Sequence, residues 1–125
     1  MEHVLDNPAW NALISGNKQF ASGNDDIRFF DADMSPFVGL KNNTATDFKA
    51  LYNLVPHSGP VCVISPCQLE VGNDWATAHL VKGLQMVCEA PAFTGGINIE
   101  PVPLAPLHIP AMLTLTRLTR PGPFG

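Results

Sequence analysis

The residues in this sequence that are best suited to metal binding or catalysis are its histidines and cysteines, and their spacing decides what chemistry they could perform. No two histidines are one helical turn apart, and Cys62 and Cys67 form a Cys-x4-Cys pair with no matching second half. This spacing disfavours a zinc site. An odd number of cysteines in apolar sequence instead predicts reduced, buried thiols. The full set is His3, His57, His79, His108, Cys62, Cys67 and Cys88.

Two of the histidines could act as general bases and one cysteine as a nucleophile. His57 follows Pro56 in a turn, and His79 falls in a predicted strand. A catalytic base also needs an orienting carboxylate and a pocket, which the sequence places for neither, so a structural role is favoured for both. Cys67 has no neighbouring basic residue to activate its thiol. An independent enzyme would need His57 or His79 to lie within hydrogen-bond reach of Cys67 in one cleft.

Composition narrows the class of protein. The chain has 125 residues, the length of one ordinary domain, with 46% hydrophobic and 14% charged residues. Such a composition excludes a disordered chain, and the low share of charge predicts that a partner covers some apolar surface. Seven basic and eleven acidic residues give a net charge of −4 without a basic cluster, which disfavours nucleic-acid binding.

The sequence also bears on localisation and on phosphate binding. Its amino terminus lacks the basic and apolar regions of a signal peptide, and no apolar run reaches the roughly 20 residues that span a membrane. We therefore expect a cytoplasmic protein with no membrane partner. Gly95-Gly96 is the one tight glycine pair, and it precedes an extended, proline-bearing segment rather than a helix. It therefore predicts a flexible link, not a phosphate-binding loop.

Hydrophobic periodicity predicts three helices. The first begins at Pro8, with Asn7 as its cap, and runs to about Phe20. The second begins at Thr46-Asp47 and ends before Pro56. The third starts at Ile109, has cations in its last turn and stops at Pro121, and the apolar Phe124 beyond it predicts a further element. A helical turn is also expected from Ser35-Pro36, carrying Phe37, Val38 and Leu40, and the two tryptophans, Trp10 and Trp75, are expected in the core.

Three segments are expected to be strands, and others to be extended or looped. Residues 27–30 and the β-branched run 59–65 predict short strands. Residues 75–89 predict a long strand kinked at Gly83, with a helix as the alternative. Residues 22–26 are expected to form a solvated loop and 97–104 an extended edge segment. We therefore predict an α+β fold with a mixed, largely antiparallel sheet flanked by helices.

Two segments, Leu84–Glu89 and Pro106–Phe124, resemble the amino-terminal half of bacterial GNAT-superfamily N-acetyltransferases. The motif Leu-Thr-Arg-Pro-Gly-Pro-Phe, ending at Phe124, is the distinctive part, and Leu5–Leu13 is similar to the start of the same proteins. The resemblance covers nearly the whole chain. It implies part of an acyl-CoA N-acyltransferase fold.

The resemblance implies a domain organisation and two substrate-lining residues. Residues 1–96 would form an amino-terminal helix and strand domain, and 97–125 would supply the first strand, Ile99–Leu104, and the first helix, Ile109–Thr119, of an incomplete acetyltransferase domain. The turn after that helix borders the acceptor site in the family, which places Arg120 and Phe124 near a substrate. His108 stands where the family usually has an acidic residue.

The largest departure from the family concerns its cofactor. Acetyl-coenzyme A is held in the family by an Arg/Gln-x-x-Gly-x-Gly/Ala loop, and no such loop occurs in these 125 residues. We therefore expect no cofactor and no catalytic residue in this chain, although full-length relatives would use acetyl-coenzyme A. The expected function is that of an acetyltransferase-related, truncated protein that binds rather than catalyses, as a homodimer or with a missing carboxyl-terminal half. The alternative is a small ligand-binding or regulatory module with a pocket between the helices and the Val61–Val87 region.

Overall fold

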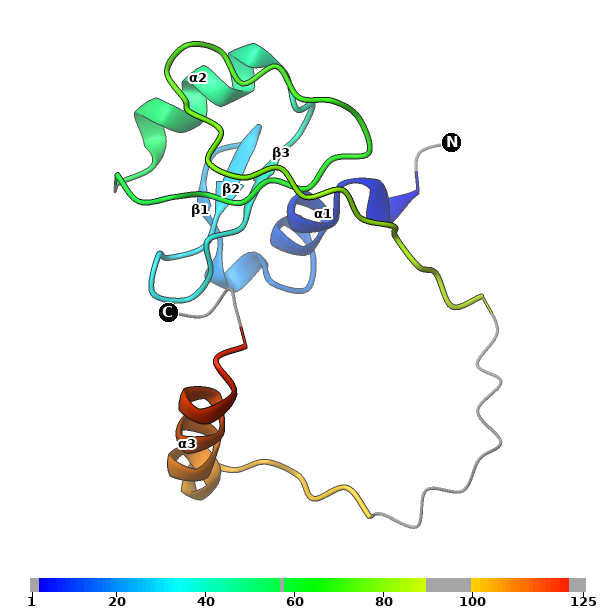
Figure 1. Cartoon of the computed structure of the whole chain (residues 1–125), viewed down its shortest axis with the longest axis vertical. Coiled ribbons are helices and arrows are strands. Elements are labelled where there is room, and N and C mark those ends of the chain that lie inside the picture. Colours follow the sequence, from blue (N-terminus) through cyan, green and yellow to red (C-terminus); the bar gives the residue numbers. More distant parts are fainter. Residues whose placement is uncertain (1–2, 57, 90–99, 122–125) are drawn as a thin grey trace. The chain divides into compact units, whose positions relative to one another are not determined.

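The computed structural model describes residues 3–56, 58–89 and 100–121 (Figure 1). Contacts divide the chain into two compact units, with the boundary between Lys82 and Gly83. The first unit carries a sheet and two of the α-helices, and the second carries one α-helix. The boundary predicted between residues 96 and 97 lies outside the described residues.

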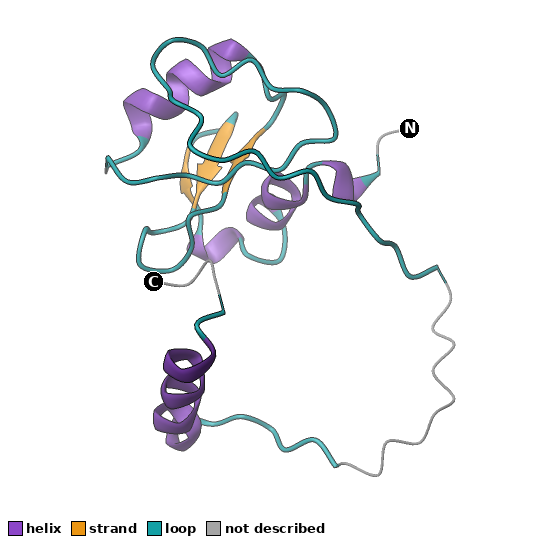
Figure 2. Cartoon of the chain, in the orientation of Figure 1, coloured by secondary structure: helices purple, strands orange, loops and turns teal. Residues whose placement is uncertain are grey.

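The first unit has α+β architecture. Its α-helices are α1 (Pro8–Ile14) and α2 (Ala45–Leu54). Its strands are β1 (Ser22–Gly23), β2 (Ile27–Phe29) and β3 (Val38–Leu40), which form an antiparallel sheet in the order β1-β2-β3 (Figure 2). Two 3-10 turns, Val4–Asp6 and Lys18–Phe20, flank α1. The predicted α+β class is therefore confirmed in its coarse form. The sheet of the described residues has three strands, and its strand pairs are antiparallel rather than mixed.

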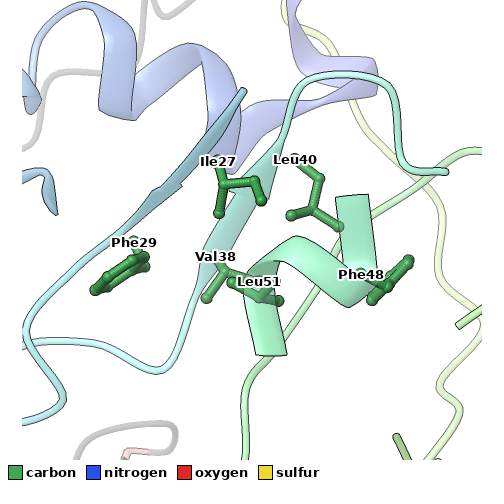
Figure 3. Close-up of a cluster of buried hydrophobic side chains, with 6 residues drawn as sticks. All are labelled: Ile27, Phe29, Val38, Leu40, Phe48 and Leu51. Carbon is green, nitrogen blue, oxygen red and sulfur yellow. The ribbon is translucent and has the colours of Figure 1, made fainter. Parts of the chain in front are cut away.

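The two helices lie on opposite faces of the sheet. Side chains alternate along a strand, so Ile27 and Phe29 share one face and Arg28 points to the other. The first face packs against α2, and Phe48 and Leu51 complete its core with Val38 and Leu40 (Figure 3). The second face lies against α1, where Gly39 touches the backbone of Trp10. A Cβ on Gly39 would lie 2.4 Å from Trp10 Cα, so the absence of a side chain permits this close approach.

The second helix owes its sharp start to a capping box. The Thr44 side chain accepts a hydrogen bond from the Asp47 N–H at 3.2 Å, and the Asp47 carboxylate accepts one from the Thr44 N–H at 3.2 Å. These bonds satisfy backbone donors that the first turn leaves without partners. The prediction of this helix is confirmed, and so is the strand over Ile27–Phe29.

Several other expectations near the sheet are wrong. The segment after Ser35-Pro36 is strand β3, because pairing with β2 outweighs a local helix-start signal. The first α-helix ends at Ile14 rather than near Phe20. Residues 22–26 were expected to form a loop, but Ser22–Gly23 is a strand that pairs with β2. Asn7 makes no side-chain cap bond, since its amide donates to the Leu40 carbonyl instead.

The predicted strands after α2 are also absent from the described residues. Within residues 59–65 only an isolated bridge, between Phe37 and Cys62, is formed. Residues 75–89 contain neither a strand nor the alternative helix. Residues 61–75 instead pack on the core without forming a strand, through side chains that include Val61, Leu69 and Trp75.

The tryptophans are half-buried rather than fully enclosed. The Trp75 indole donates a hydrogen bond to the Phe48 carbonyl at 2.8 Å, and its ring meets Tyr52 edge to face at 5.8 Å. Trp75 thus packs at the margin of the core, so its predicted place in the core is confirmed in part. The thiols are not buried as expected, since Cys62 is half-buried and Cys67 and Cys88 are exposed.

The second unit contains α3 (Ile109–Thr119), preceded by a 3-10 turn at Pro106–His108. The predicted third helix is therefore confirmed. Residues 100–104 carry no strand, so the expected strand Ile99–Leu104 is not formed over its described part. In the described parts of the chain, no helix combines the length and apolarity needed to cross a membrane.

Candidate functional site

A groove of about 630 Å³ on the first unit is the strongest candidate for a binding site. Three segments that are distant in sequence surround it: the amino-terminal turn with the start of α1, the turn between β3 and α2, and the loop that follows Ile64. Polar side chains dominate its lining. The lining residues are His3, Val4, Asp6, Asn7, Trp10, Asn11, Lys41, Asn42, Asn43, Ser65, Pro66, Cys67, Gln68 and Leu69.

Hydrogen bonds hold the amino-terminal wall of the groove in place. His3 Nδ1 accepts from the Leu5 N–H at 3.1 Å, and Asp6 Oδ2 accepts from the His3 N–H at 2.8 Å. Asn7 donates its side-chain N–H to the Leu40 carbonyl at 2.6 Å, which ties this wall to β3. Asn11 donates to the Val4 carbonyl at 2.7 Å. These bonds fix the orientation of both amides and leave their carbonyl oxygens free to accept.

The second wall is the turn from Lys41 to Asn43. The Lys41 ammonium lies 3.1 Å from the Asp26 carboxylate, so its charge is locally offset. The Asn42 N–H donates to Asp47 Oδ2 at 3.2 Å, which links the turn to the start of α2. Asn43 has a φ of 55°, in the left-handed region that asparagine tolerates better than most residues. Its Oδ1 is buried without a hydrogen-bond partner.

The third wall contains the one predicted nucleophile. Cys67 is exposed, and its N–H donates to Ser65 Oγ at 3.2 Å. His79 is not among the residues that line the groove, and His57 lies outside the described residues. The structure therefore does not bring Cys67 and His79 together in this cleft. A cysteine enzyme that pairs these two side chains here has no geometric support.

Metal ligands do not gather in the described residues either. No group of three or more His, Cys, Asp and Glu side chains there could hold a metal ion. A smaller hollow of about 470 Å³ lies at the carboxyl-terminal end of α1 and is lined by Leu13, Ile14, Lys18, Gln19 and Arg28. Arg28 Nε is buried there without a partner, and its guanidinium meets Asp25 at 3.7 Å.

The carboxyl-terminal helix is a second candidate, of a different kind. None of its residues is buried, although it carries Ile109, Met112, Leu113, Leu115 and Leu118. Its threonine hydroxyls bond back to their own helix, as Thr114 does to the Pro110 carbonyl at 2.9 Å. The surface of α3 is therefore apolar on several sides, and its threonine hydroxyls already have hydrogen-bond partners within the helix.

The two residues that the resemblance placed near a substrate lie at the end of this helix. Arg120 caps α3 in the left-handed conformation, with a φ of 44°, and its N–H donates to the Thr116 carbonyl at 2.8 Å. It is exposed. Phe124 lies outside the described residues. The role of both near an acceptor stays a prediction.

Comparison with known proteins finds no matching family model, no matching curated protein and no matching solved structure. The alternative interpretation placed a pocket between the helices and the Val61–Val87 region, and the groove lies partly there, between α1 and residues 65–69. Its polar lining was not predicted, because its walls come from three separate segments. The adjacent amide side chains of Asn42 and Asn43, which line the groove, were a local signal to which the sequence analysis assigned no role.

Proposed function

We propose that this chain is a non-catalytic binding protein whose second unit is completed by a second copy of the same chain. The observation that carries the proposal is α3, an 11-residue helix with five large apolar side chains and no buried residue among those described. An isolated helix of this length is marginal in water. Packing against another surface is what would stabilise it.

The positions of the apolar residues support a buried role for α3. Successive residues turn by about 100° around a helix, so Ile109 and Leu113 lie on one side while Leu118 lies on the opposite side. A helix that is apolar on opposite sides is typically enclosed by protein. Arg117 is the one charged residue between Ile109 and Thr119. The opposite sides of α3 could therefore pack on more than one neighbour.

The gain from covering α3 is of the size that association requires. Burying the exposed halves of five large apolar side chains is worth about 4–8 kcal/mol per helix. A symmetric pair gains this twice, against a cost of about 4–15 kcal/mol for bringing two proteins together. A second copy supplies an equivalent helix at every concentration of the protein, which makes a homodimer the simplest arrangement.

The finer form of the proposal relates the chain to the amino-terminal half of GNAT N-acetyltransferases. In support, α3 spans Ile109–Thr119, the segment that the resemblance assigns to the first helix of that domain. In this form the partner that covers α3 could also be a separate carboxyl-terminal acetyltransferase half. Neither the chain alone nor its dimer would transfer an acetyl group, since the pyrophosphate loop is missing from the sequence.

Light scattering across a concentration series tests the proposal. We expect a mass that rises toward twice 13.5 kDa. Leu115→Glu should shift the dissociation constant upward by at least tenfold, because it places a charge on the covered helix. The matched control is Leu80→Glu, which changes a still more exposed leucine of the first unit and should leave the mass unchanged. A monomer at every concentration would contradict self-association.

Calorimetric titration with acetyl-coenzyme A tests the cofactor part of the proposal separately. We expect no heat of binding from the purified chain at micromolar concentrations. Saturable micromolar binding would overturn the statement that this chain lacks a cofactor site. It would also make a catalytic role worth testing with amine acceptors.

A further inference from the structure

We propose that the groove on the first unit binds a neutral, hydroxyl-rich ligand, a monosaccharide or short oligosaccharide. This inference goes beyond self-association, because the groove is built entirely from residues 3–69 and involves no part of α3. The volume of about 630 Å³ lies within the range typical of small-molecule sites.

The first argument is the concentration of carboxamides in the lining. A carboxamide presents both donors and an acceptor, and a hydroxyl group likewise donates and accepts, so the two are matched partners. The N–H groups of Asn7 and Asn11 are held by backbone carbonyls, which leaves each side-chain oxygen as a fixed acceptor. Five of the fourteen lining residues are carboxamides: Asn7, Asn11, Asn42, Asn43 and Gln68.

The second argument is the charge balance. Asp6 and Lys41 are the two formally charged residues of the lining, with histidine counted as neutral, and they have opposite signs. The Lys41 ammonium is already paired with the Asp26 carboxylate at 3.1 Å. No unpaired cation of the lining is thus available for a phosphate or sulfate. The lining therefore disfavours an anion, whereas the Asp6 carboxylate, which accepts the His3 N–H, can accept a further hydrogen bond from a hydroxyl group.

The third argument is the presence of both an indole and further hydrogen-bond donors. Trp10 is a half-buried residue of the lining, and an indole is a side chain whose apolar face suits the C–H face of a sugar. His3 Nδ1 accepts from the Leu5 N–H, so the neutral ring carries its hydrogen on Nε2 and can donate. Apolar contact on one side and mixed polar contacts on the other suit a polyol.

Two-dimensional 1H–15N NMR of the full chain, titrated with D-glucose, N-acetyl-D-glucosamine and maltotriose, tests the proposal. The two indole N–H signals give an internal comparison, because Trp75 Nε1 is bonded to the Phe48 carbonyl and Trp75 does not line the groove. We expect at least one sugar to shift the Trp10 signal in a saturable manner, with a millimolar or lower dissociation constant, and to leave the Trp75 signal in place. Arginine hydrochloride and sodium sulfate are the charged comparisons.

A pair of glutamine variants locates the binding. Gln68→Ala removes an exposed carboxamide of the groove that makes no hydrogen bond in the structure, so folding should be unaffected. We expect it to weaken sugar binding about three- to tenfold, the effect of losing one or two hydrogen bonds. Gln19→Ala, in the same unit but outside the groove, should not change the affinity.

Three results would overturn the proposal. The first is the absence of a saturable Trp10 shift with all three sugars. The second is an equal shift of Trp10 and Trp75, which would indicate a general solvent effect. The third is stronger binding of arginine or sulfate than of any sugar, which would assign the groove to a charged ligand. Because every signal used comes from the first unit, these results do not depend on whether α3 self-associates.

Discussion

The two units of this chain use apolar residues in opposite ways. The first unit, through Lys82, encloses Leu13, Ile27, Leu40 and Leu51 completely. In the second unit, from Gly83, no described residue is buried, although its sequence is rich in leucine, valine and methionine. Hydrophobic content alone therefore does not make a core. A core also requires segments from distant parts of the sequence to converge, as β2, β3 and α2 do.

The two units also differ in the number of charged residues, of which the second unit has fewer. The sequence through Lys82 carries five basic and nine acidic residues, whereas the remainder carries two of each. Glu89, Glu100, Arg117 and Arg120 are thus the whole charge of a 43-residue segment. Low charge together with exposed apolar side chains is typical of a surface that another protein covers. The first unit resembles a self-sufficient domain by both measures.

Matched leucine variants should reveal the difference most strongly. Leu51→Ala removes a side chain that is 0% exposed and should lower the free energy of unfolding by about 2–5 kcal/mol. Leu118→Ala, at 78% exposure, should change it by less than about 0.5 kcal/mol where the chain is monomeric. Urea unfolding followed by tryptophan fluorescence measures both. Equal losses would mean that α3 belongs to the same cooperative unit as the core.

Matched glycine variants should give the next effect in size. In Gly39→Ala the new Cβ would lie 2.4 Å from Trp10 Cα, so α1 and β3 must separate and stability should fall by about 1–3 kcal/mol. Gly83→Ala has no heavy atom within 4 Å of its Cβ and should be neutral or slightly stabilising. Thermal unfolding by circular dichroism measures the two midpoints. A neutral Gly39→Ala would refute the close packing of α1 on the sheet.

A pair of threonine variants compares a helix cap with a helix surface. Thr44→Ala removes the side-chain oxygen that accepts from the Asp47 N–H, and should cost about 1 kcal/mol. Thr114→Ala removes a hydroxyl that bonds only to its own helix, at the Pro110 carbonyl, and should leave the unfolding free energy unchanged. Urea unfolding curves of the two variants can be compared directly. A larger loss for Thr114→Ala would show that α3 contributes to the measured transition.

What could be predicted from the sequence follows from how local each signal is. The second and third helices were predicted because their periodicity, caps and prolines lie within a few residues of one another. Strand β3 was missed because its conformation depends on pairing with β2 and on the space that Gly39 leaves for α1. The alternating pattern of residues 75–89 predicted a strand, but the described residues offer it no partner strand.

The groove shows the same limit for function. Asn7 was interpreted as a helix cap, and Cys67 as a nucleophile with nothing beside it to activate its thiol. Their common position becomes evident only when the turn at Lys41 folds back toward the amino terminus. Sequence spacing carries no information about three walls that are separated by more than twenty residues. Chemistry that depends on such convergence must be argued from the structure.

The finest comparison uses the left-handed residues other than glycine, because each unit has one among its described residues. Arg120 caps α3 at a φ of 44° and Asn43 lies in the groove at 55°. Glycine carries no Cβ penalty in this region, so Arg120→Gly should favour the α3 end by up to about 1 kcal/mol, and Asn43→Gly should change stability by only a few tenths of a kcal/mol. Slower hydrogen exchange at the residue 120 amide, bonded to the Thr116 carbonyl, should report the first change. If the units fold independently, Arg120→Gly will leave the urea midpoint of the first unit where it is, since a local gain at α3 does not propagate to a core it does not share. A raised midpoint would instead show that the first unit and α3 unfold together, and the contrast between the two regions would then lie in exposure alone and not in cooperativity.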